Sequence, residues 1–293
     1  MRVQVCIPHY FREQNDPSDN PNGYGSQRRG ARLSRSIALA RCISALLDVQ
    51  RRKETCLLNI SNRSIEHFAN HETSLEVAIC VCTDGTNQLN DVLDLYQNKI
   101  QVITLPLENP RDLPLACRDH LINNHGEADL LTYMEDDLVI HDKLFFDKLM
   151  WFHTNSNHQL SLMPHRYERV DAGNMETLMV DGPNFTGQFT RPQQHVAHGK
   201  FRGMESVSFD MADNPHSGTF TVSRMQAEKL KASTLPRMGF IGPLETAATL
   251  TVLLPFPVLK PSRECWKFLR VEHGAPSFLH TINSLPHHVA TSN

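Results

Sequence analysis

The chain has 293 residues, of which 40% are hydrophobic and 21% are charged, and its formal net charge is −3. These values are typical of a soluble globular protein with a substantial core, and they disfavour a nucleic-acid scaffold, which needs a concentrated basic surface. No apolar stretch is long enough to span a bilayer, and the N-terminus is too interrupted for a signal peptide and is better interpreted as a first strand.

Cysteine usage and one basic cluster bear on location and partners. The seven cysteines are scattered, and most fall in predicted apolar strands or helices. Buried reduced thiols in a reducing cytosol are the simple interpretation, so we expect a cytoplasmic protein. A cluster of arginines on a predicted helix is more typical of a solvated helix face than of a binding surface. It consists of Arg28, Arg29, Arg32 and Arg35.

The first half of the chain alternates predicted strands and helices. Apolar runs predict strands at residues 3–7, 75–82, 100–105 and 130–134. Helical spacing of apolar residues predicts helices over residues 29–51, 89–96 and 112–124. The polar segment 11–30 is a long loop of the kind that is often functional. This order predicts an α/β fold, Rossmann-like, with a mostly parallel central sheet flanked by helices.

Three candidate positions fall at the ends of predicted strands. Pro8 ends the first strand, Asp84 follows the second, and the acidic triplet Glu135-Asp136-Asp137 follows the fourth. Ligands bind at the carboxyl ends of the strands in such sheets. We therefore expect these positions to form a single site.

The acidic triplet is unusual because apolar runs flank it on both sides. Burying charge costs several kcal/mol unless the charge is paired or coordinates a metal. In an extended chain, Glu135 and Asp137 share one side and Asp136 takes the other. Two carboxylates on one side at a strand end can hold a hard divalent cation. The alternative is a solvated turn between strand and loop.

The second half is less regular. A helix is expected after the acids, short strands at 159–163, 177–180 and 218–223, and helices from residue 224 and over 244–253. Residues 186–217 form a long polar stretch that is either a flexible lid or an extended loop, and residues 255–293 form a tail rich in proline and histidine. No repeat or convincing linker is present, so we expect one domain over residues 1–293.

Several of these motifs, in this order, resemble the nucleotide-sugar glycosyltransferases of the A-type (GT-A) fold. The motifs are the N-terminal strand, the turn Thr83 to Thr86, the helix with Cys117-Arg118, and the strand ending in the acidic triplet. The resemblance covers roughly residues 1–145 and, more loosely, 215–280. It implies a nucleotide-sugar-binding half, 1–145, and an acceptor-binding half with the tail, 146–293.

The resemblance also implies an activity and a cofactor. The family moves a sugar from a nucleotide diphosphate sugar to a hydroxyl acceptor, and a short acidic motif binds Mn²⁺ or Mg²⁺, which holds the donor diphosphate. On this basis we expect a hexosyltransferase-like enzyme whose partners are the donor and a saccharide or other hydroxyl acceptor. Asp137 is the first choice of metal ligand, Glu135 is the second, and Asp136 is placed to touch the donor ribose or sugar.

Other donor-site residues are implied in the same way, each with an alternative. Asp84 would contact the base or ribose, or else cap its own turn. Pro8 and Tyr10 lie where the donor pocket begins, although Tyr10 could equally be ordinary packing. Arg118 would lie near the donor, or else on a helix surface.

The second half supplies two further candidates. Glu245 would be the general base that deprotonates the acceptor hydroxyl, or else an acid favoured by the helix macrodipole. The chain lacks the usual Glu-Asp pair there, which leaves the base and the stereochemistry open. His280, in preference to His273, would be a further metal ligand, although a lone histidine is more often structural or solvated.

Two other functions fit the same residues. A nucleotidyltransferase acting on sugar phosphates would need a Gly-rich, basic loop after the first strand, and Gly23, Gly25, Arg28, Arg29 and Gly30 occur there without a phosphate-loop signature. A non-catalytic metal-binding or carbohydrate-binding module is the third possibility. The intact acids Asp137 and Glu245 speak mildly against it.

Overall fold

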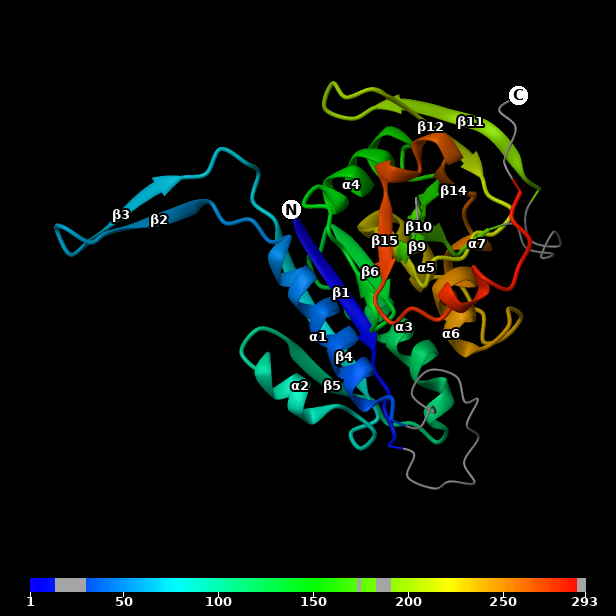
Figure 1. The fold of residues 1–293 in the computed structure, drawn as a ribbon, viewed down its shortest axis with the longest axis horizontal. Coiled ribbons are helices and arrows are strands. Elements are labelled where there is room, and N and C mark those ends of the chain that lie inside the picture. The colour runs from blue at the N-terminus through cyan, green and yellow to red at the C-terminus, as the bar shows by residue number, and fades with distance from the viewer. Residues whose placement is uncertain (14–29, 173–174, 183–190, 289–293) are drawn as a thin grey trace.

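The computed structural model describes residues 1–13, 30–172, 175–182 and 191–288 (Figure 1). Its central sheet has the strand order β13-β6-β1-β4-β5, in which β13 alone runs antiparallel to its neighbour. The strands are β1 (Arg2–Pro8), β4 (Glu76–Thr83), β5 (Gln101–Thr104), β6 (Leu130–Met134) and β13 (Thr219–Ser223). The expected α/β fold with a mostly parallel sheet is confirmed. Because β13 pairs with β6, the two halves of the chain share this sheet.

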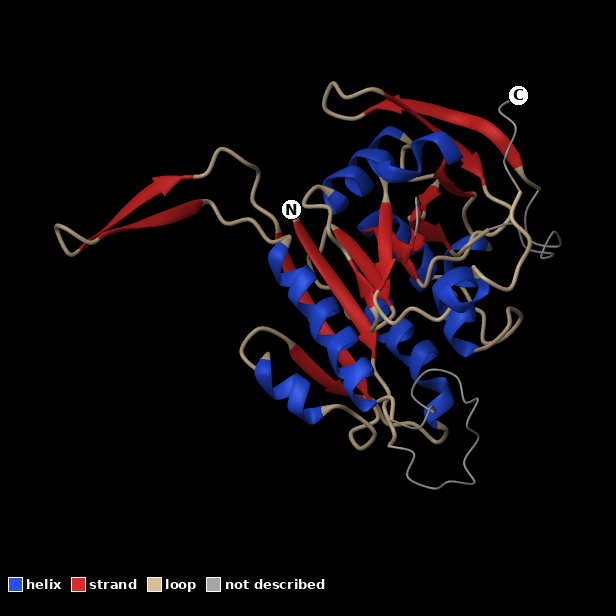
Figure 2. Ribbon diagram, in the orientation of Figure 1, coloured by secondary structure: helices blue, strands red, loops and turns tan. Residues whose placement is uncertain are grey.

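Helices cover both faces of the central sheet (Figure 2). Alternate residues of a strand point to opposite faces, and Val5 packs in one core cluster with Leu39, whereas Cys6 packs in another with Cys117. The first cluster lies under α1 (Arg32–Asp48) and α2 (Asn90–Leu95), and the second under α3 (Leu113–Asn123). The predicted helices are therefore present, each a few residues shorter than the sequence suggested.

The second half adds two small mixed sheets beside the central one. One has the order β10-β9-β15-β7 and the other β11-β12-β14-β8. The first contains β7 (Leu138–Val139), β9 (His165–Ala172), β10 (Met175–Met179) and β15 (Arg270–His273), and the second β8 (Ser161–Leu162), β11 (Gln193–Lys200), β12 (Ser206–Met211) and β14 (Val258–Pro261). The chain therefore passes from the acidic triplet directly into β7, which pairs with the tail strand β15.

The polar stretch 186–217 differs from its prediction. Residues 186–190 lie outside the described residues, but β11 and β12 pair as an antiparallel hairpin within the remainder. Residues 193–211 of the stretch are therefore a strand pair with its connecting turn, and not a lid or an extended loop. The remaining helices are α4 (Phe145–Asn155), α5 (Arg224–Lys231), α6 (Pro243–Glu245) and α7 (Thr251–Leu253), with a π-helical segment, Thr246–Leu250, joining the last two.

A two-stranded hairpin that the sequence did not predict extends from the body (Figure 1). It consists of β2 (Glu54–Asn59) and β3 (Ser64–Ala69), which among the described strands pair only with each other. Arg63 takes a positive φ of 48° in the connecting turn.

Among the described helices, none is both long and apolar enough to cross a bilayer.

Candidate functional site

The acidic triplet lies at the carboxyl edge of the central sheet, where parallel strands β1, β4 and β6 all end. Glu135, Asp136 and Asp137 are only 7%, 7% and 8% exposed, so the triplet is not a solvated turn. Its backbone is held on both sides: the Glu135 N–H donates to Gly218 O at 3.0 Å, and the Gly274 N–H donates to Asp137 O at 2.6 Å. The carboxylates are therefore fixed in place and shielded from bulk water.

Arg35 of α1 spans the last two acids of the triplet. Its guanidinium donates to Asp137 Oδ2 at 2.8 Å and, through the second nitrogen, to Asp136 Oδ1. Burial would raise the pKa of Asp137, but Arg35 and His273 together outweigh burial and hold that pKa below its usual range. The prediction that Arg35 belongs to a solvated helix face is therefore wrong. Of the other arginines in that cluster, Arg32 is exposed, and Arg28 and Arg29 lie outside the described residues.

Asp136 has a second partner on the loop after β1. Its Oδ2 lies 2.7 Å from His9 Nδ1, and the Leu89 N–H donates to His9 Nε2 at 3.1 Å. Because Nε2 accepts, Nδ1 carries the proton and donates to Asp136. Burial alone would raise the pKa of Asp136, but Arg35 and His9 together lower it. Asp136 is therefore an ionised acid whose position is fixed by two donors.

The tail histidine beside the triplet is His273 of β15. Its Nε2 is 3.5 Å from Asp137 Oδ2, and its Nδ1 is 2.7 Å from Glu168 Oε1. Burial opposes its protonation, but the two carboxylates outweigh burial and raise the pKa of His273 to about 9. His280, the favoured candidate in the sequence, is exposed on the short turn Leu279–Thr281. The structure thus brings His273 to Asp137 and leaves His280 at the surface.

Glu135 differs from its two neighbours. Its nearest cation is Arg166, whose Nη1 lies 3.7 Å from Glu135 Oε2. Burial dominates over this longer contact and, with the charge of Asp137, raises the pKa of Glu135 to about 8. A Cβ at position 218 would lie 2.8 Å from Glu135 Oε2, and Gly218 has a φ of 67°. Glycine at this position therefore leaves room for the Glu135 carboxyl group.

Two oxygens of the triplet fit a hard cation. Glu135 Oε1 and Asp137 Oδ1 are buried without a hydrogen bond to any described residue. Within the described part of the chain, no group of three or more His, Cys, Asp or Glu side chains is spaced to hold an ion. Carboxylates of this kind typically supply one or two ligands to Mg²⁺ or Mn²⁺, and substrate phosphates and water supply the others. The residues present fit such a partial site.

The remaining first-half candidates have structural partners. Asp84 Oδ1 accepts from the backbone N–H groups of Thr86 and Asn87 at 2.9 and 2.7 Å, as expected for a residue that caps its own turn. Tyr10 packs against the core cluster under α3, and Pro8 ends β1 in register with Cys82.

Arg118 is neither at the surface nor open to a donor. It is 0% exposed, and its guanidinium donates to Asp119, to Thr251 and to the carbonyl of Pro236. Its role in this structure is to tie α3 to the loop after α5.

Glu245 lies near the triplet on α6 and is half-buried. Its charge is among the causes that raise the pKa of Glu135, after burial and the charge of Asp137. Among the described residues, none donates a hydrogen bond to the Glu245 carboxylate. Glu245 is therefore an available base close to the buried acids.

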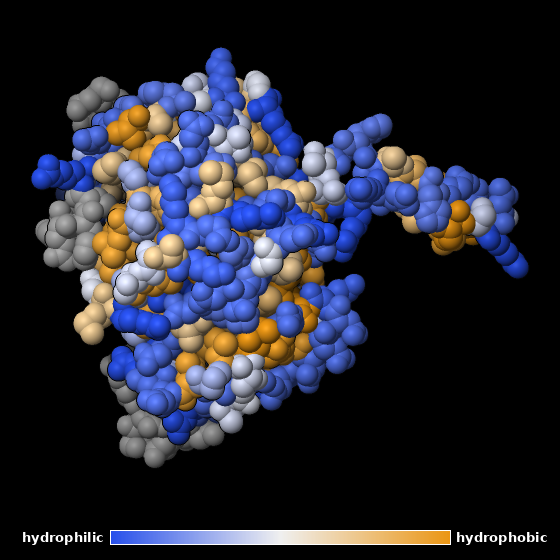
Figure 3. Space-filling model, turned by 180° about the vertical axis from the view of Figure 1, so that it is seen from behind, coloured by the Kyte–Doolittle hydropathy of each residue, from blue (hydrophilic) through white to orange (hydrophobic). Residues whose placement is uncertain are grey.

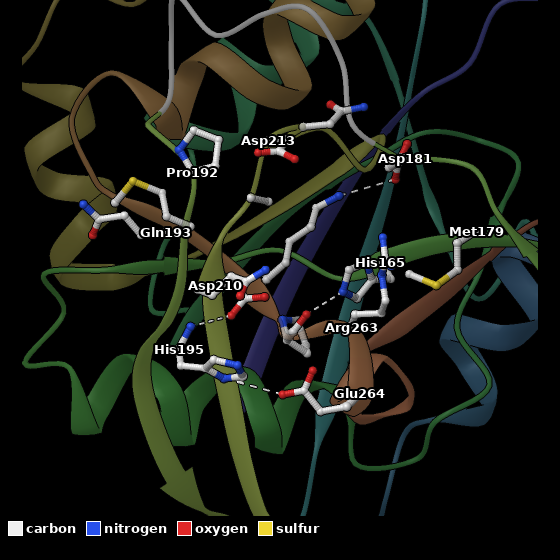
Figure 4. A pocket seen from close by; sticks show the side chains of 17 residues that line it. His165, Met179, Asp181, Pro192, Gln193, His195, Asp210, Asp213, Arg263 and Glu264 are labelled. Carbon is white, nitrogen blue, oxygen red and sulfur yellow. Dashed lines mark hydrogen bonds and ion pairs between the residues drawn. The ribbon is translucent and has the colours of Figure 1, made fainter. Parts of the chain in front are cut away.

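A cavity of about 770 Å³ is lined in part by Asp181, the ion-pair partner of Arg166 (Figure 4). Arg166 Nη2 donates to Asp181 Oδ1 at 2.9 Å, and Lys260 Nζ lies 3.6 Å from Asp181 Oδ2. Asp181 Oδ2 is buried without a hydrogen bond to a described residue and belongs to the cavity wall. Carboxylates and amides also line the wall, among them Asp210, Asp213, Glu264, Gln193 and Gln194.

The cavity is thus joined to the triplet by one chain of contacts, from Glu135 through Arg166 and Asp181 to Lys260. Burial lowers the pKa of Lys260, although Asp181 opposes this change. The walls present many hydrogen-bond acceptors, which suit a ligand that is rich in hydroxyl groups. Sequence reasoning did not find this cavity, because its residues come from five strands and the loops beside them, which lie far apart in the chain.

The sequence matches no protein-family model and no curated protein. In three dimensions the chain is similar to GalNAc-T7, solved with UDP, GalNAc and Mn²⁺, at 11% identity over 92% of this chain and 42% of that one, with a TM-score of 0.46. It is also similar to residues 1–349 of S. aureus TarS, at 13% identity over 93% of this chain and 60% of that one, with a TM-score of 0.45.

A complex of the same TarS segment with UDP-GlcNAc gives 13% identity, 94% coverage of this chain, 61% coverage of that chain and a TM-score of 0.42. The chain spans about half the length of these proteins. At TM-scores below 0.5, these similarities carry no argument about the site, and its function rests on its own geometry.

Proposed function

We propose that this protein is a metal-dependent glycosyltransferase that moves a sugar from a nucleotide diphosphate sugar to a hydroxyl acceptor. One observation carries the proposal: at the carboxyl edge of a parallel sheet, two buried carboxylate oxygens, Glu135 Oε1 and Asp137 Oδ1, have no hydrogen-bond partner among the described residues. Such oxygens suit a divalent cation, and this edge is where α/β sheets bind nucleotides.

On the donor side, Asp137 and Glu135 would hold Mn²⁺ or Mg²⁺. When bound, the cation supplies charge neutralisation to the leaving nucleoside diphosphate. Asp136 is fixed by Arg35 and His9, which suits it to accept a hydrogen bond from a donor hydroxyl group. Glu135 must lose its proton before it can bind a cation, because its pKa is raised to about 8.

On the acceptor side, Glu245 would remove the proton of the attacking hydroxyl group. The 770 Å³ cavity beyond Arg166 would bind the acceptor, since its walls are lined by carboxylates and amides. We further propose a cytoplasmic location, because all seven cysteines are free thiols in the structure.

Donor hydrolysis tests this function directly. Purified protein is incubated with Mn²⁺ and a panel of UDP- and GDP-sugars, and release of the nucleoside diphosphate is measured. We expect release from at least one donor, and its loss in Asp137→Ala but not in Asp94→Ala, which removes an exposed acid of α2. Pyrophosphate release from NTP and sugar phosphate would instead identify a nucleotidyltransferase, and metal binding without turnover would identify a binding module.

A further inference from the structure

The hairpin of β2 and β3, called the arm below, is an unusual element for a folded chain. A two-stranded ribbon is at best marginally stable alone in water, and the arm extends from the body with both faces in solvent (Figure 1). Its apolar side chains stay largely exposed, because packing within the arm does not cover them (Figure 3). Leu57 is 54% exposed, Leu58 62%, Ile60 79%, Ile65 54% and Phe68 52%.

We propose that the arm is a dimerisation element, in which β2 pairs antiparallel with β2 of a second copy about a two-fold axis at Leu57. The result is a four-stranded sheet, large enough to be stable where a hairpin is not. The proposal is independent of the sugar-transfer function, since none of the site residues lies on the arm.

The backbone of β2 has a free edge with the required spacing. The Asn70 N–H donates to Lys53 O at 2.8 Å, so the polar backbone groups of Lys53 face β3. Along an antiparallel strand, the N–H and C=O groups of successive residues point alternately toward one neighbouring strand and away from it. The backbone groups of Leu57 therefore also face β3, whereas Cys56 and Leu58 present their N–H and C=O groups outward. With the axis at Leu57, Cys56 exchanges two hydrogen bonds with the partner's Leu58, and Leu58 does the same with the partner's Cys56.

The side chains of β2 suit this register. Leu57 meets the partner's Leu57 in the non-hydrogen-bonded pair, where side chains approach most closely. Glu54, the single charge of β2, falls opposite the partner's Ile60, so no like charges meet along the strand. Pairing through the middle of β3 would instead set Glu66 against Glu66 or His67 against His67. Charge and apolarity therefore favour the β2 edge.

The same register gives the tip of each arm a place to pack. It brings the partner's Ile60 alongside residues 51–54, at the base of the arm. A cavity of about 330 Å³ lies at that base, and Arg51, Thr73 and Ser74 contribute to its wall. Its apolar lining comes from Met1, Met150, Trp151 and Phe201. Because the axis is two-fold, each copy supplies one tip and one cavity, and the contact closes at a dimer.

The molar mass in solution tests the proposal. Light scattering after size exclusion, over a range of protein concentrations, should give twice the chain mass of 33.3 kDa for the wild type. Leu57→Lys sets two ammonium groups against each other at the axis and should halve the mass. Leu33→Lys, at a residue of α1 that is 72% exposed, is the matched control and should leave the dimer intact.

A cross-link tests the register separately. In a Cys56→Ser background, Leu57→Cys places two thiols at the axis, and added copper phenanthroline should oxidise them to a disulfide-linked dimer on a non-reducing gel. Ile65→Cys in the same background lies one strand away from the axis and should not cross-link. A monomeric wild type at all concentrations, or a dimer that Leu57→Lys leaves unchanged, would overturn the proposal, with circular dichroism confirming that each variant is folded.

Discussion

The three acids of the triplet are consecutive in the chain, but their pKa values shift in opposite directions. Arg35 lies within hydrogen-bond distance of Asp136 and Asp137 and holds the pKa of both below the usual range, whereas Arg166 lies 3.7 Å from Glu135 and leaves its pKa at about 8. Two acids are therefore ionised without a metal, and the third gains its charge at higher pH. The difference shows that burial alone does not decide the ionisation of these acids; the hydrogen bonds and charges of Arg35, His9 and His273 offset burial at Asp136 and Asp137, and the weaker contact with Arg166 does not offset it at Glu135.

The strongest way to break this contrast is to remove Arg35. Arg35→Met leaves two buried carboxylates without their main cation, and breaking a buried pair in this way costs about 3–5 kcal/mol of unfolding free energy. Chemical denaturation measures the loss. Arg32→Met, which removes exposed ion pairs with Glu13 and Asp91 on the same helix, should change the free energy by about 1 kcal/mol or less.

A second part of this prediction concerns the cation. Mn²⁺ should restore more of the lost stability in Arg35→Met than it adds to the wild type, because the cation and the guanidinium neutralise the same carboxylates. Equal stabilisation of both proteins by Mn²⁺ would contradict a shared site.

Next in size is the effect of Glu245→Gln on turnover. Loss of a general base typically lowers the rate by about 10²–10⁴-fold, while donor affinity should stay within about twofold, because Glu245 is not expected to hold the donor. Steady-state kinetics and nucleotide titration separate the two effects. A large loss of donor affinity with unchanged turnover would place Glu245 in donor binding instead.

The pH dependence of the free energy of unfolding tests the raised pKa of Glu135, the acid that differs from its two neighbours. Because the pKa of Glu135 is raised from 4.5 to about 8 in the folded protein, the folded state binds more protons than the unfolded state between these values. Stability therefore falls as pH rises from 4.5 to 8, and this contribution is constant above 8. Glu135→Gln should remove that part of the slope, as measured by denaturation at a series of pH values.

The smallest expected effect is at Asp84. Asp84→Ala should cost about 1 kcal/mol, since its carboxylate accepts hydrogen bonds from its own turn. If turn capping is its main role, Asp84→Asn should recover most of this stability, and nucleotide affinity should not change in either variant. An affinity lost in Asp84→Asn despite normal stability would instead support a contact to the base or ribose.

The sequence was sufficient to predict the sheet and the position of the acids. Apolar runs and helical spacing placed the strands, and parallel topology brought their carboxyl ends together. The sequence could not predict the interaction partners of the acids, because Arg35 and Asp137 are separated by 102 residues and Glu168 and His273 by 105. Local patterns carry no signal for such contacts, which is why Arg35 was misassigned to a solvated face.

The arm was missed for a different reason. Its short strands lack a clear apolar–polar alternation, since leucines occur side by side at 57 and 58. Apolar–polar alternation indicates a strand with one buried face, and neither face of the arm is buried within one chain. A strand that gains its partner from another copy leaves a weaker pattern in the sequence.

Cation binding at the triplet tests the account most directly. Electron spin resonance can follow free Mn²⁺ during titration with protein and UDP, at pH 8.5, where Glu135 is mostly ionised. We predict one bound Mn²⁺ per chain in the wild type and in Asp94→Asn, and affinity at least ~100-fold weaker in Asp137→Asn. Equal Mn²⁺ affinity in the wild type and in folded Asp137→Asn would contradict the central claim.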